Sequence, residues 1–389
     1  MKRNPILLAA VILTIATQLH AQQIPSPVRV MQKVADKLAS VKHLGYKYRF
    51  EYSVPSQDRT RVAQGVAFLD LKPEDGTSQF RFQFDFEDLK NTYNGTEQFY
   101  LEEKGKKLHV ESKPMFKSQG NISLQNSPLS LKYALPKIIA DKSIPKKVSL
   151  TRTGNRDHYV IEFSLYKGAL NSAGEIIETG PEMTSKYQLK VDKSTFLPVE
   201  VIETNDKSDA TLTTTYSELT EKPPSPAAPS WYFSTYQNDY ALQKKEKLVL
   251  IESGKAAPGF SLDGFASTTK TSLDQYKGKL VLLEFWITHC GFCIAAVPKL
   301  NSIHQNYRDK GVEVISINMY DPAATIESFN KKHKAEYMIL MGGESIAGSY
   351  GVESYPAIVL IDRSGKVVYS TSGLFEKELE AAIVANLKQ

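Results

Sequence analysis

Cysteine is nearly absent from this chain, since its 389 residues contain only Cys290 and Cys293. Both belong to one Cys-Gly-Phe-Cys motif, and a disulfide across so short a loop would remove little entropy from the unfolded chain. A framework of structural disulfides is therefore excluded. No second cysteine pair or histidine-rich stretch lies near the motif, so the roughly four ligands that structural zinc needs are missing. We predict no metal and no cofactor beyond a redox-active disulfide between Cys290 and Cys293.

Strong charge and long hydrophobic runs are lacking as well. The net charge of +5 is small for this length, and no arginine-rich stripe with interleaved aromatic residues occurs, which excludes nucleic acid as a partner. The apolar run from Ile6 to Ala16 follows Lys2 and Arg3. It is shorter than the roughly 17–25 residues of a retained transmembrane anchor, which is the alternative interpretation. A basic start, a short apolar core and a small residue at Ala21 are typical of a secretory signal peptide.

The predicted signal peptide spans residues 1–21, with cleavage after Ala21. No cysteine lies near the cut, which excludes a lipoprotein anchor, and no later segment is apolar enough to span a bilayer. We therefore expect an exported protein that is soluble in the periplasm once the signal peptide is removed.

The remaining length predicts two domains and a linker. We place a β-rich domain at residues 23–220, a linker at 221–254 and a second domain at 255–389. The linker begins with the proline-rich run Glu221–Ser230, which favours a semi-extended spacer. The segment Trp231–Tyr236 is too aromatic for a pure spacer, and the sequence leaves open which domain it packs on.

The first domain shows helical and then strand periodicity. Apolar residues recur at helical spacing over 27–41, and 129–140 is a second helical interval. Strands are predicted at 46–54, 80–86, 89–93, 98–102, 108–111, 147–153, 159–166, 185–191, 198–203 and 210–217. The pattern predicts an α+β domain with a meandering antiparallel sheet and two helices. Its aromatic stripe either packs on the helices or lines a half-barrel that holds an apolar ligand.

The order of helix, long strands, helix and further strands resembles the LolA-like half-barrel of Gram-negative envelope proteins. Two phrases carry the resemblance, Tyr93-Asn-Gly-Thr-Glu-Gln-Phe-Tyr100 and Leu189-Lys-Val-Asp-Lys-Ser-Thr-Phe-Leu-Pro-Val199. It covers roughly half of the chain and implies a fold more than a function, because this domain carries no catalytic constellation.

The second domain alternates between strands and helices. Strands are predicted at 280–287, 312–318, 357–361 and 367–370, and helices at 291–309, 323–332 and 376–387. This order predicts an α/β domain with a central mixed sheet covered on both faces. The first strand delivers Cys290 to the start of a helix, where unpaired backbone N–H groups and the helix dipole lower the pKa of a thiol.

Five motifs of this domain resemble thioredoxin-like proteins of the TlpA/ResA class, collinearly over its whole length. They are Ala257-Pro-Gly-Phe-Ser-Leu262, Tyr276-Lys-Gly-Lys-Leu-Val-Leu-Leu-Glu-Phe-Trp286, Cys290-Gly-Phe-Cys293, Gly311-Val-Glu-Val-Ile315, and Tyr350-Gly-Val with Tyr355-Pro-Ala and Leu360-Ile-Asp-Arg-Ser-Gly-Lys366. The resemblance implies thiol–disulfide exchange in the cell envelope.

The resemblance also implies roles for single residues. Cys290 would be the attacking thiolate, and Cys293 would resolve the mixed disulfide. Pro356 matches the cis-proline that lies opposite the dithiol, and Tyr355 would offer backbone groups to a substrate strand. Trp286 belongs to the same expected substrate-binding set.

Glu284 and His289 complete the candidate site. Burial of a carboxylate in the apolar run before the motif would raise its pKa, and the resemblance implies that Glu284 accepts the proton of the resolving thiol. The alternative is a solvated glutamate at a strand edge.

His289 replaces the usual tryptophan before the first cysteine. It either favours the Cys290 thiolate when protonated or is a solvent-facing substitution. Two further residues depart from the family pattern. Ala296 stands where ResA-type proteins carry an acid, three residues after the second cysteine. Phe292 stands where the common Cys-Gly-Pro-Cys motif has its proline.

The predicted function is an exported thiol-disulfide oxidoreductase that reduces disulfides of envelope proteins, including apocytochromes before haem attachment. A membrane thiol electron donor would recharge it. The departures at His289 and Phe292 leave the direction of electron flow open, so a disulfide oxidase or isomerase is an alternative. The alternative from another class is an envelope protein that binds a lipid or apolar ligand in the first domain and uses the dithiol as a redox switch.

Overall fold

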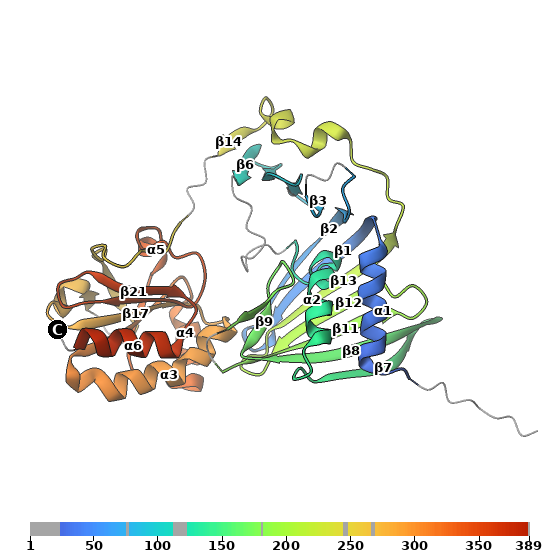
Figure 1. Ribbon diagram of the computed structural model, residues 1–389. Helices are drawn as coiled ribbons and strands as arrows, with labels where there is room; N and C mark the ends of the chain where they lie inside the picture. Colours follow the sequence, from blue (N-terminus) through green and yellow to red (C-terminus); the bar gives the residue numbers. More distant parts are fainter. Residues whose placement is uncertain are drawn as a thin grey trace, which may run out of the picture.

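The computed structural model describes residues 24–74, 78–111, 123–179, 182–243, 248–265 and 269–387. The predicted signal peptide lies outside the described residues. Two domains lie side by side, and a connecting segment runs across the first of them before it reaches the second (Figure 1). Among the described residues, no helix combines the length and the apolarity needed to cross a bilayer.

The first domain consists of a large sheet and two helices, α1 (Pro27–Ser40) and α2 (Pro128–Ala140). Its strands are β1 (His43–Val54), β2 (Arg59–Asp70), β3 (Arg81–Phe86), β4 (Leu89–Tyr93), β5 (Gln98–Glu102), β6 (Lys107–Glu111), β7 (Lys146–Thr153), β8 (Arg156–Tyr166), β9 (Gly168–Leu170), β10 (Ile176–Glu178), β11 (Thr184–Asp192), β12 (Pro198–Asn205) and β13 (Thr211–Thr220). In the described part they run in the order β10-β9-β11-β12-β13-β1-β2-β3-β4-β5-β6, and β8 also pairs with β11 and carries β7 on its other side. Apart from the short contact of β9 with β11, neighbouring strands in this set are antiparallel.

The aromatic stripe forms the core between the sheet and the helices. Tyr48 of β1 and Phe82 and Phe84 of β3 are buried in one cluster with Met31 of α1 and Leu135 of α2. The rings of Tyr48 and Phe84 meet edge to face, with centroids 5.7 Å apart. This arrangement matches the interpretation in which the sheet packs on its helices, whereas the half-barrel of the LolA-like resemblance stays a prediction.

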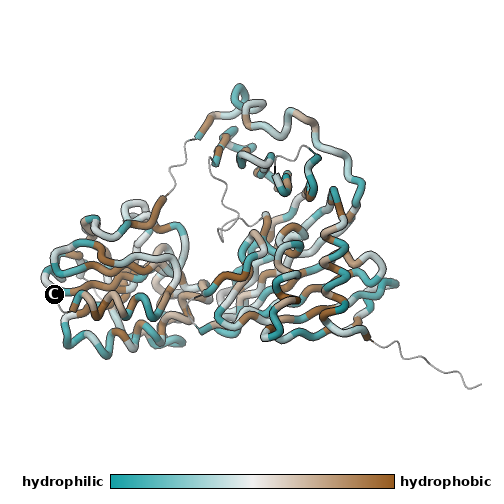
Figure 2. The backbone as a smooth tube through the Cα atoms, in the orientation of Figure 1, coloured by the Kyte–Doolittle hydropathy of each residue, from teal (hydrophilic) through white to brown (hydrophobic). Residues whose placement is uncertain are grey.

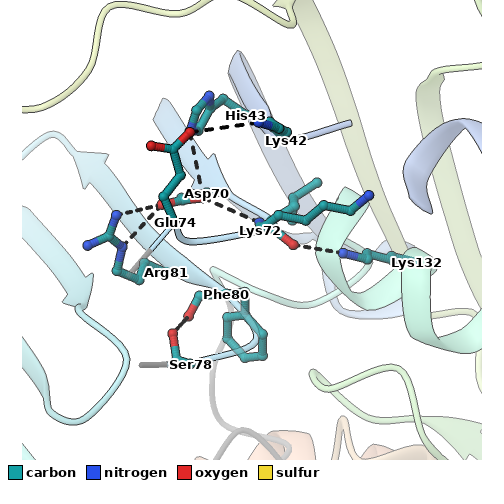
Figure 3. Close-up of polar contacts among 10 residues, drawn as sticks. Lys42, His43, Asp70, Lys72, Glu74, Ser78, Phe80, Arg81 and Lys132 are labelled. Carbon is teal, nitrogen blue, oxygen red and sulfur yellow. Dashed lines mark hydrogen bonds and ion pairs between the residues drawn. The ribbon is translucent and has the colours of Figure 1, made fainter. Parts of the chain in front are cut away.

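A buried acid joins neighbouring strands of this sheet. Asp70, at the end of β2, is only 2% exposed. It accepts hydrogen bonds from Nε and Nη2 of Arg81 at 3.1 and 2.7 Å and from the backbone N–H of Lys72 at 3.3 Å. Figure 3 shows its carboxylate reaching Arg81 on β3 and the ring of His43 on β1, whose Nε2 lies 3.7 Å away. One carboxylate thereby ties together β1, β2 and β3.

The aromatic segment after the proline-rich run packs on the first domain, which answers the question that the sequence left open. It contains two 3-10 helices, η2 (Ala228–Trp231) and η3 (Phe233–Tyr236), and ends in β14 (Ala241–Gln243), which pairs in parallel with β6. Trp231 is buried against Phe68 and lies under the guanidinium of Arg81, 5.1 Å from the ring centroid. Residues 228–243 therefore belong structurally to the first domain. The second domain begins before residue 255, because Ile251 already donates a backbone hydrogen bond to Tyr350 at 2.9 Å.

The second domain is a mixed sheet between helices. Its elements are β15 (Ser261–Gly264), β16 (Lys270–Ser272), η4 (Leu273–Tyr276), β17 (Leu280–Trp286), α3 (Gly291–Tyr307), η5 (Arg308–Lys310), β18 (Val312–Asn318), α4 (Ala323–His333), β19 (Met338–Met341), α5 (Glu344–Tyr350), β20 (Ala357–Ile361), β21 (Val367–Ser372) and α6 (Glu376–Leu387). The sheet order is β16-β15-β19-β18-β17-β20-β21. β17 pairs in parallel with β18 and antiparallel with β20, so the predicted mixed sheet is confirmed.

β17 is the central strand of this domain, and every residue in it is buried. Hydrophobic colour is concentrated along the central strands of this domain in Figure 2. Burial on both faces explains why the sequence of β17 is a continuous apolar run instead of an alternating one. The run ends where the chain turns into α3, and this fixes the position of the dithiol.

We expect Asp70→Asn to destabilise the protein by on the order of 3 kcal/mol, because it removes the buried negative charge that accepts two hydrogen bonds from Arg81. Urea unfolding followed by circular dichroism measures the change. The control is Glu218→Gln, which breaks an exposed pair with Lys47 and should cost below about 1 kcal/mol. Equal effects of the two substitutions would show that Asp70 is not an anchor of the sheet.

Candidate active site

The two cysteines lie at the junction between β17 and α3. Cys290 is the N-cap residue of α3, and its Sγ accepts a hydrogen bond from the backbone N–H of Cys293 at 3.1 Å. The two residues form a disulfide, with their Cα atoms 5.2 Å apart. Cys293 is 1% exposed and packs in the interior, whereas Cys290 is half-buried. Cys290 is therefore the sulfur that a substrate can reach.

The loop before β20 lies opposite the dithiol. The peptide bond between Tyr355 and Pro356 is cis, as the resemblance predicted. The backbone oxygen of Tyr355 lies 3.5 Å from Sγ of Cys290. Ala357, the next residue, already pairs with Phe285 of β17. The strand pairing of β17 with β20 therefore brings this loop to Cys290, 65 residues away in the sequence.

Glu284 lies inside the domain and is only 2% exposed, which is incompatible with a solvated glutamate at a strand edge. Alternation along β17 places it on the same face as Leu282 and Trp286, the face that packs on α3 and α4. Burial raises the pKa of Glu284 to about 8, while hydrogen bonds from the Ser316 and Tyr337 hydroxyls pull it part of the way back. The carboxyl is therefore mostly protonated at neutral pH.

Trp286 packs in the core next to the buried cysteine of the dithiol. It is 2% exposed and packs in one cluster with Cys293 and Val297, and its ring lies 4.5 Å from that of Phe329. This burial leaves no indole surface for a substrate. The expectation that Trp286 contacts substrate is not met in this conformation, because the apolar run carries its side chain into the core.

His289 contacts the first domain. Its side chain is 10% exposed, so it does not face solvent. Tyr52 of β1 donates a hydrogen bond from its hydroxyl to the backbone oxygen of His289 at 3.1 Å, and Nη1 of Arg59 lies 3.1 Å from Nδ1 of the ring. Burial and the Arg59 charge lower the pKa of His289, although Asp321, with Oδ1 3.9 Å from Nδ1, acts in the opposite direction. The ring is therefore neutral at neutral pH and does not supply the positive charge considered from the sequence.

The first turns of α3 carry the two departures from the family pattern. Ala296 is fully buried in the core, and α3 continues through Pro298. Because Ala296 has no carboxylate, Glu284 is the buried acid on this face of the sheet. Phe292 is half-buried and lines a cavity beside Cys290.

This cavity, of about 430 Å³, lies between the two domains. Its lining includes Cys290, His289 and Tyr355 from the second domain and Tyr52 and Leu212 from the first. The sequence did not predict that the first domain lines this cavity. In the sequence, Tyr52 and Leu212 look like any other residues of strands with alternating polarity. Among the described residues, no three His, Cys, Asp or Glu side chains are grouped as metal ligands would be.

Comparisons with known proteins match this second domain. A protein family described as Redoxin matches residues 252–387. The thiol-disulfide oxidoreductase ResA of Bacillus cereus is 34% identical over 148 residues, which are 38% of this chain and 82% of that protein. ResA of Geobacillus thermodenitrificans is 32% identical over 129 residues, which are 33% of this chain and 74% of that protein. A crystal structure from Chlorobium tepidum, described as a thiol:disulfide interchange protein DsbE, is 31% identical and covers 36% of this chain and 99% of that one, with a TM-score of 0.34.

We expect Glu284→Gln to stabilise the fold at alkaline pH and to change little in acid. The folded pKa of about 8 lies above the ordinary value of 4.5, so the folded state keeps a proton that the unfolded state has lost. The resulting cost is absent below the ordinary pKa, grows between the two values and reaches several kcal/mol above the folded one.

Urea unfolding at about pH 5 and about pH 9 measures this difference. Glu313→Gln on the neighbouring strand β18, whose carboxylate pairs with Lys279 near the surface, is the control and should show no such pH dependence. A gain from Glu284→Gln that is equal at both pH values would contradict the raised pKa.

Proposed function

This chain belongs, through its second domain, to the thioredoxin-like thiol-disulfide oxidoreductases of the ResA type, and we propose that it is exported to the periplasm and reduces disulfides in envelope proteins. The observation that carries this proposal is the pairing of an accessible sulfur at the N-terminus of α3 with a buried second sulfur one turn further on. The same geometry would serve apocytochromes c before haem attachment, whose cysteines must be reduced.

The proposed reaction runs in two exchanges. The Cys290 thiolate attacks one sulfur of the substrate disulfide, so that a mixed disulfide forms and the other substrate sulfur leaves as a thiolate. Cys293 then attacks Sγ of Cys290, which releases the second substrate sulfur and closes the Cys290–Cys293 disulfide. Two electrons pass from the protein to the substrate, and a membrane thiol donor restores the dithiol by the same exchange in reverse.

The backbone N–H of Cys293 assists the first exchange. It donates to Sγ of Cys290, and a sulfur that carries negative charge is a better acceptor than a neutral one. The helix dipole of α3 adds to the effect, because Cys290 occupies its N-cap. The sulfur that must be a thiolate to attack therefore lies where the chain best stabilises a negative charge.

Glu284 is proposed to take the proton that Cys293 loses in the second exchange, in the fraction of molecules in which its carboxyl is ionised, and this fraction grows as the pH approaches 8. A base works best when its pKa is close to that of the acid it deprotonates, and a pKa of about 8 is close to that of an ordinary thiol. An ordinary glutamate would be too weak a base for this transfer. Burial of Glu284 costs folding free energy, and the raised pKa that results is the property that suits this carboxylate to the proposed proton transfer.

The apolar-ligand function considered for the first domain has less support. The aromatic residues that would line its ligand cavity, including Tyr46, Tyr48 and Phe82, are packed against α1 and α2. A ligand on that face would have to displace the helices. We propose that this domain serves the dithiol instead of acting as a carrier.

We expect Cys293→Ser to accumulate mixed disulfides between Cys290 and envelope proteins, because the resolving thiol is gone. Acid quenching, non-reducing electrophoresis and mass spectrometry identify the trapped partners. Cys290→Ser is the matched control and should trap none, since Cys293 is buried. If Cys293→Ser traps no envelope protein in cells, the proposed function is wrong.

The direction of electron flow needs a separate measurement. Equilibration of the Cys290–Cys293 pair with glutathione gives its reduction potential, and we expect a value closer to the roughly −270 mV of thioredoxin than to the roughly −120 mV of the oxidant DsbA. The redox state in cells, determined by thiol alkylation, should then be mainly reduced. A potential near the oxidising end would favour the oxidase or isomerase alternative.

A further inference from the structure

The sheet of the first domain extends to the dithiol. Four directly paired residues form a row across neighbouring strands: Tyr187 of β11 with Glu203 of β12, Glu203 with Leu212 of β13, and Leu212 with Tyr52 of β1. Directly paired residues point to the same face of a sheet. This is also the face of Tyr48, which packs on the helices. The helices therefore cover the inner face of the sheet at Tyr48, and the same face borders the cavity beside Cys290 at Tyr52, Glu203 and Leu212.

Specific contacts hold this end of the sheet against the active site. The Tyr52 hydroxyl donates to the backbone oxygen of His289, and Arg59 lies against the His289 ring. Asn205, at the end of β12, covers the residue after Cys290: a Cβ added to Gly291 would lie 3.1 Å from Nδ2 of Asn205. That spacing is tighter than an ordinary van der Waals contact, so the first domain comes as close to the Cys-Gly-Phe-Cys turn as a glycine allows.

The cavity between these contacts has a mixed lining. Met183, Ala210 and Leu212 supply apolar surface from the first domain, and Ser185 and Glu203 supply polar groups. The Glu203 carboxylate is fixed in place, since it accepts hydrogen bonds from Tyr187, Gln125 and Asn126 at 3.0–3.1 Å. Opposite it, Tyr355 supplies backbone groups beside Cys290. Side-chain pockets next to exposed backbone are the features that bind an extended peptide.

We propose that the first domain forms the second wall of the substrate site, and that the cleft between the two walls takes a single extended polypeptide segment carrying the disulfide. The volume of about 430 Å³ is within the range of roughly 300–1,000 Å³ typical of small-ligand sites. The surface of a folded domain cannot reach Cys290 past Tyr52 and Asn205 while the walls are in contact. This inference rests on the proposed function, because the segment is reduced by the exchanges described above.

The test compares kcat/KM of full-length variants on three disulfides: cystamine, an unstructured peptide with one disulfide, and the same disulfide in a surface loop of a folded protein. Leu212→Trp fills the cleft and should lower kcat/KM for the peptide at least about tenfold while leaving cystamine within about twofold, because only the peptide needs the full length of the cleft. Thr213→Trp is the matched control: it is the next residue of β13, points to the opposite face, and should change neither substrate.

A second variant changes the wall without filling the cleft. Arg59→Ala removes the contact with His289, so the wall should loosen, and kcat/KM for the folded protein should rise several-fold relative to kcat/KM for cystamine, which reports any change in the dithiol itself. Circular dichroism verifies that each variant is folded. The inference is overturned if Leu212→Trp reduces the peptide as fast as the unmodified protein does, or if the unmodified protein reduces the folded protein as fast as the peptide. Failure of the unmodified protein to reduce any of the three would instead count against the proposed function.

Discussion

The hydrogen bond from the backbone N–H of Cys293 to the sulfur of Cys290 is the contact on which the rest of the site depends. It exists because a fully buried strand ends one turn before a helix begins, so that Cys290 caps that helix. N-cap positions normally carry an oxygen that accepts the same bond. A sulfur there is stabilised as a thiolate by a donor that needs no rearrangement, and the burial of β17 on both faces keeps that donor in place.

The same burial sets the properties of Glu284. A carboxylate on the central strand cannot reach water, and Ser316 and Tyr337 offer hydroxyl partners but no positive charge. Its pKa therefore rises, and the fold tolerates a cost that an apolar residue would avoid. Such a cost at a position beneath a dithiol is typical of a functional group, because packing alone would favour leucine or valine at this position.

The central strands and the helices α3, α4 and α6 of the second domain were predicted well from the sequence, whereas β15, β16, β19 and α5 were missed. The first domain was predicted less well, for physical reasons. The apolar run of β17, the helix after it and the Tyr355–Pro356 loop are local patterns, and each was predicted close to its observed place. β2 was missed although it has twelve residues. Its inward positions include Ala63, Gly65 and Ala67, and Gly65 has no room for a side chain, because a Cβ there would lie 2.0 Å from the backbone oxygen of Asp85. Small inward residues remove the alternation that indicates a strand.

Tyr52 and Arg59 were missed for another reason. They lie 237 and 230 residues from His289 in sequence, and nothing in their local pattern separates them from other residues of an amphipathic strand. Only the packing of the two domains brings them to the dithiol. Residues that act through contacts between domains carry no spacing signature, so a single sequence indicates the sulfur chemistry but not the wall that faces it.

The contact between the domains also changes how charge reaches the dithiol. A protonated histidine before Cys290 would provide positive charge only in acid, and burial together with Arg59 makes His289 neutral at neutral pH. The guanidinium of Arg59 lies against the ring of the residue that precedes Cys290. The first domain thereby supplies a cation next to the residue that precedes the dithiol. Tyr52 and Arg59, from the neighbouring strands β1 and β2, both contact His289. A change in the packing of the first domain on the second would therefore alter substrate access and thiolate stability together.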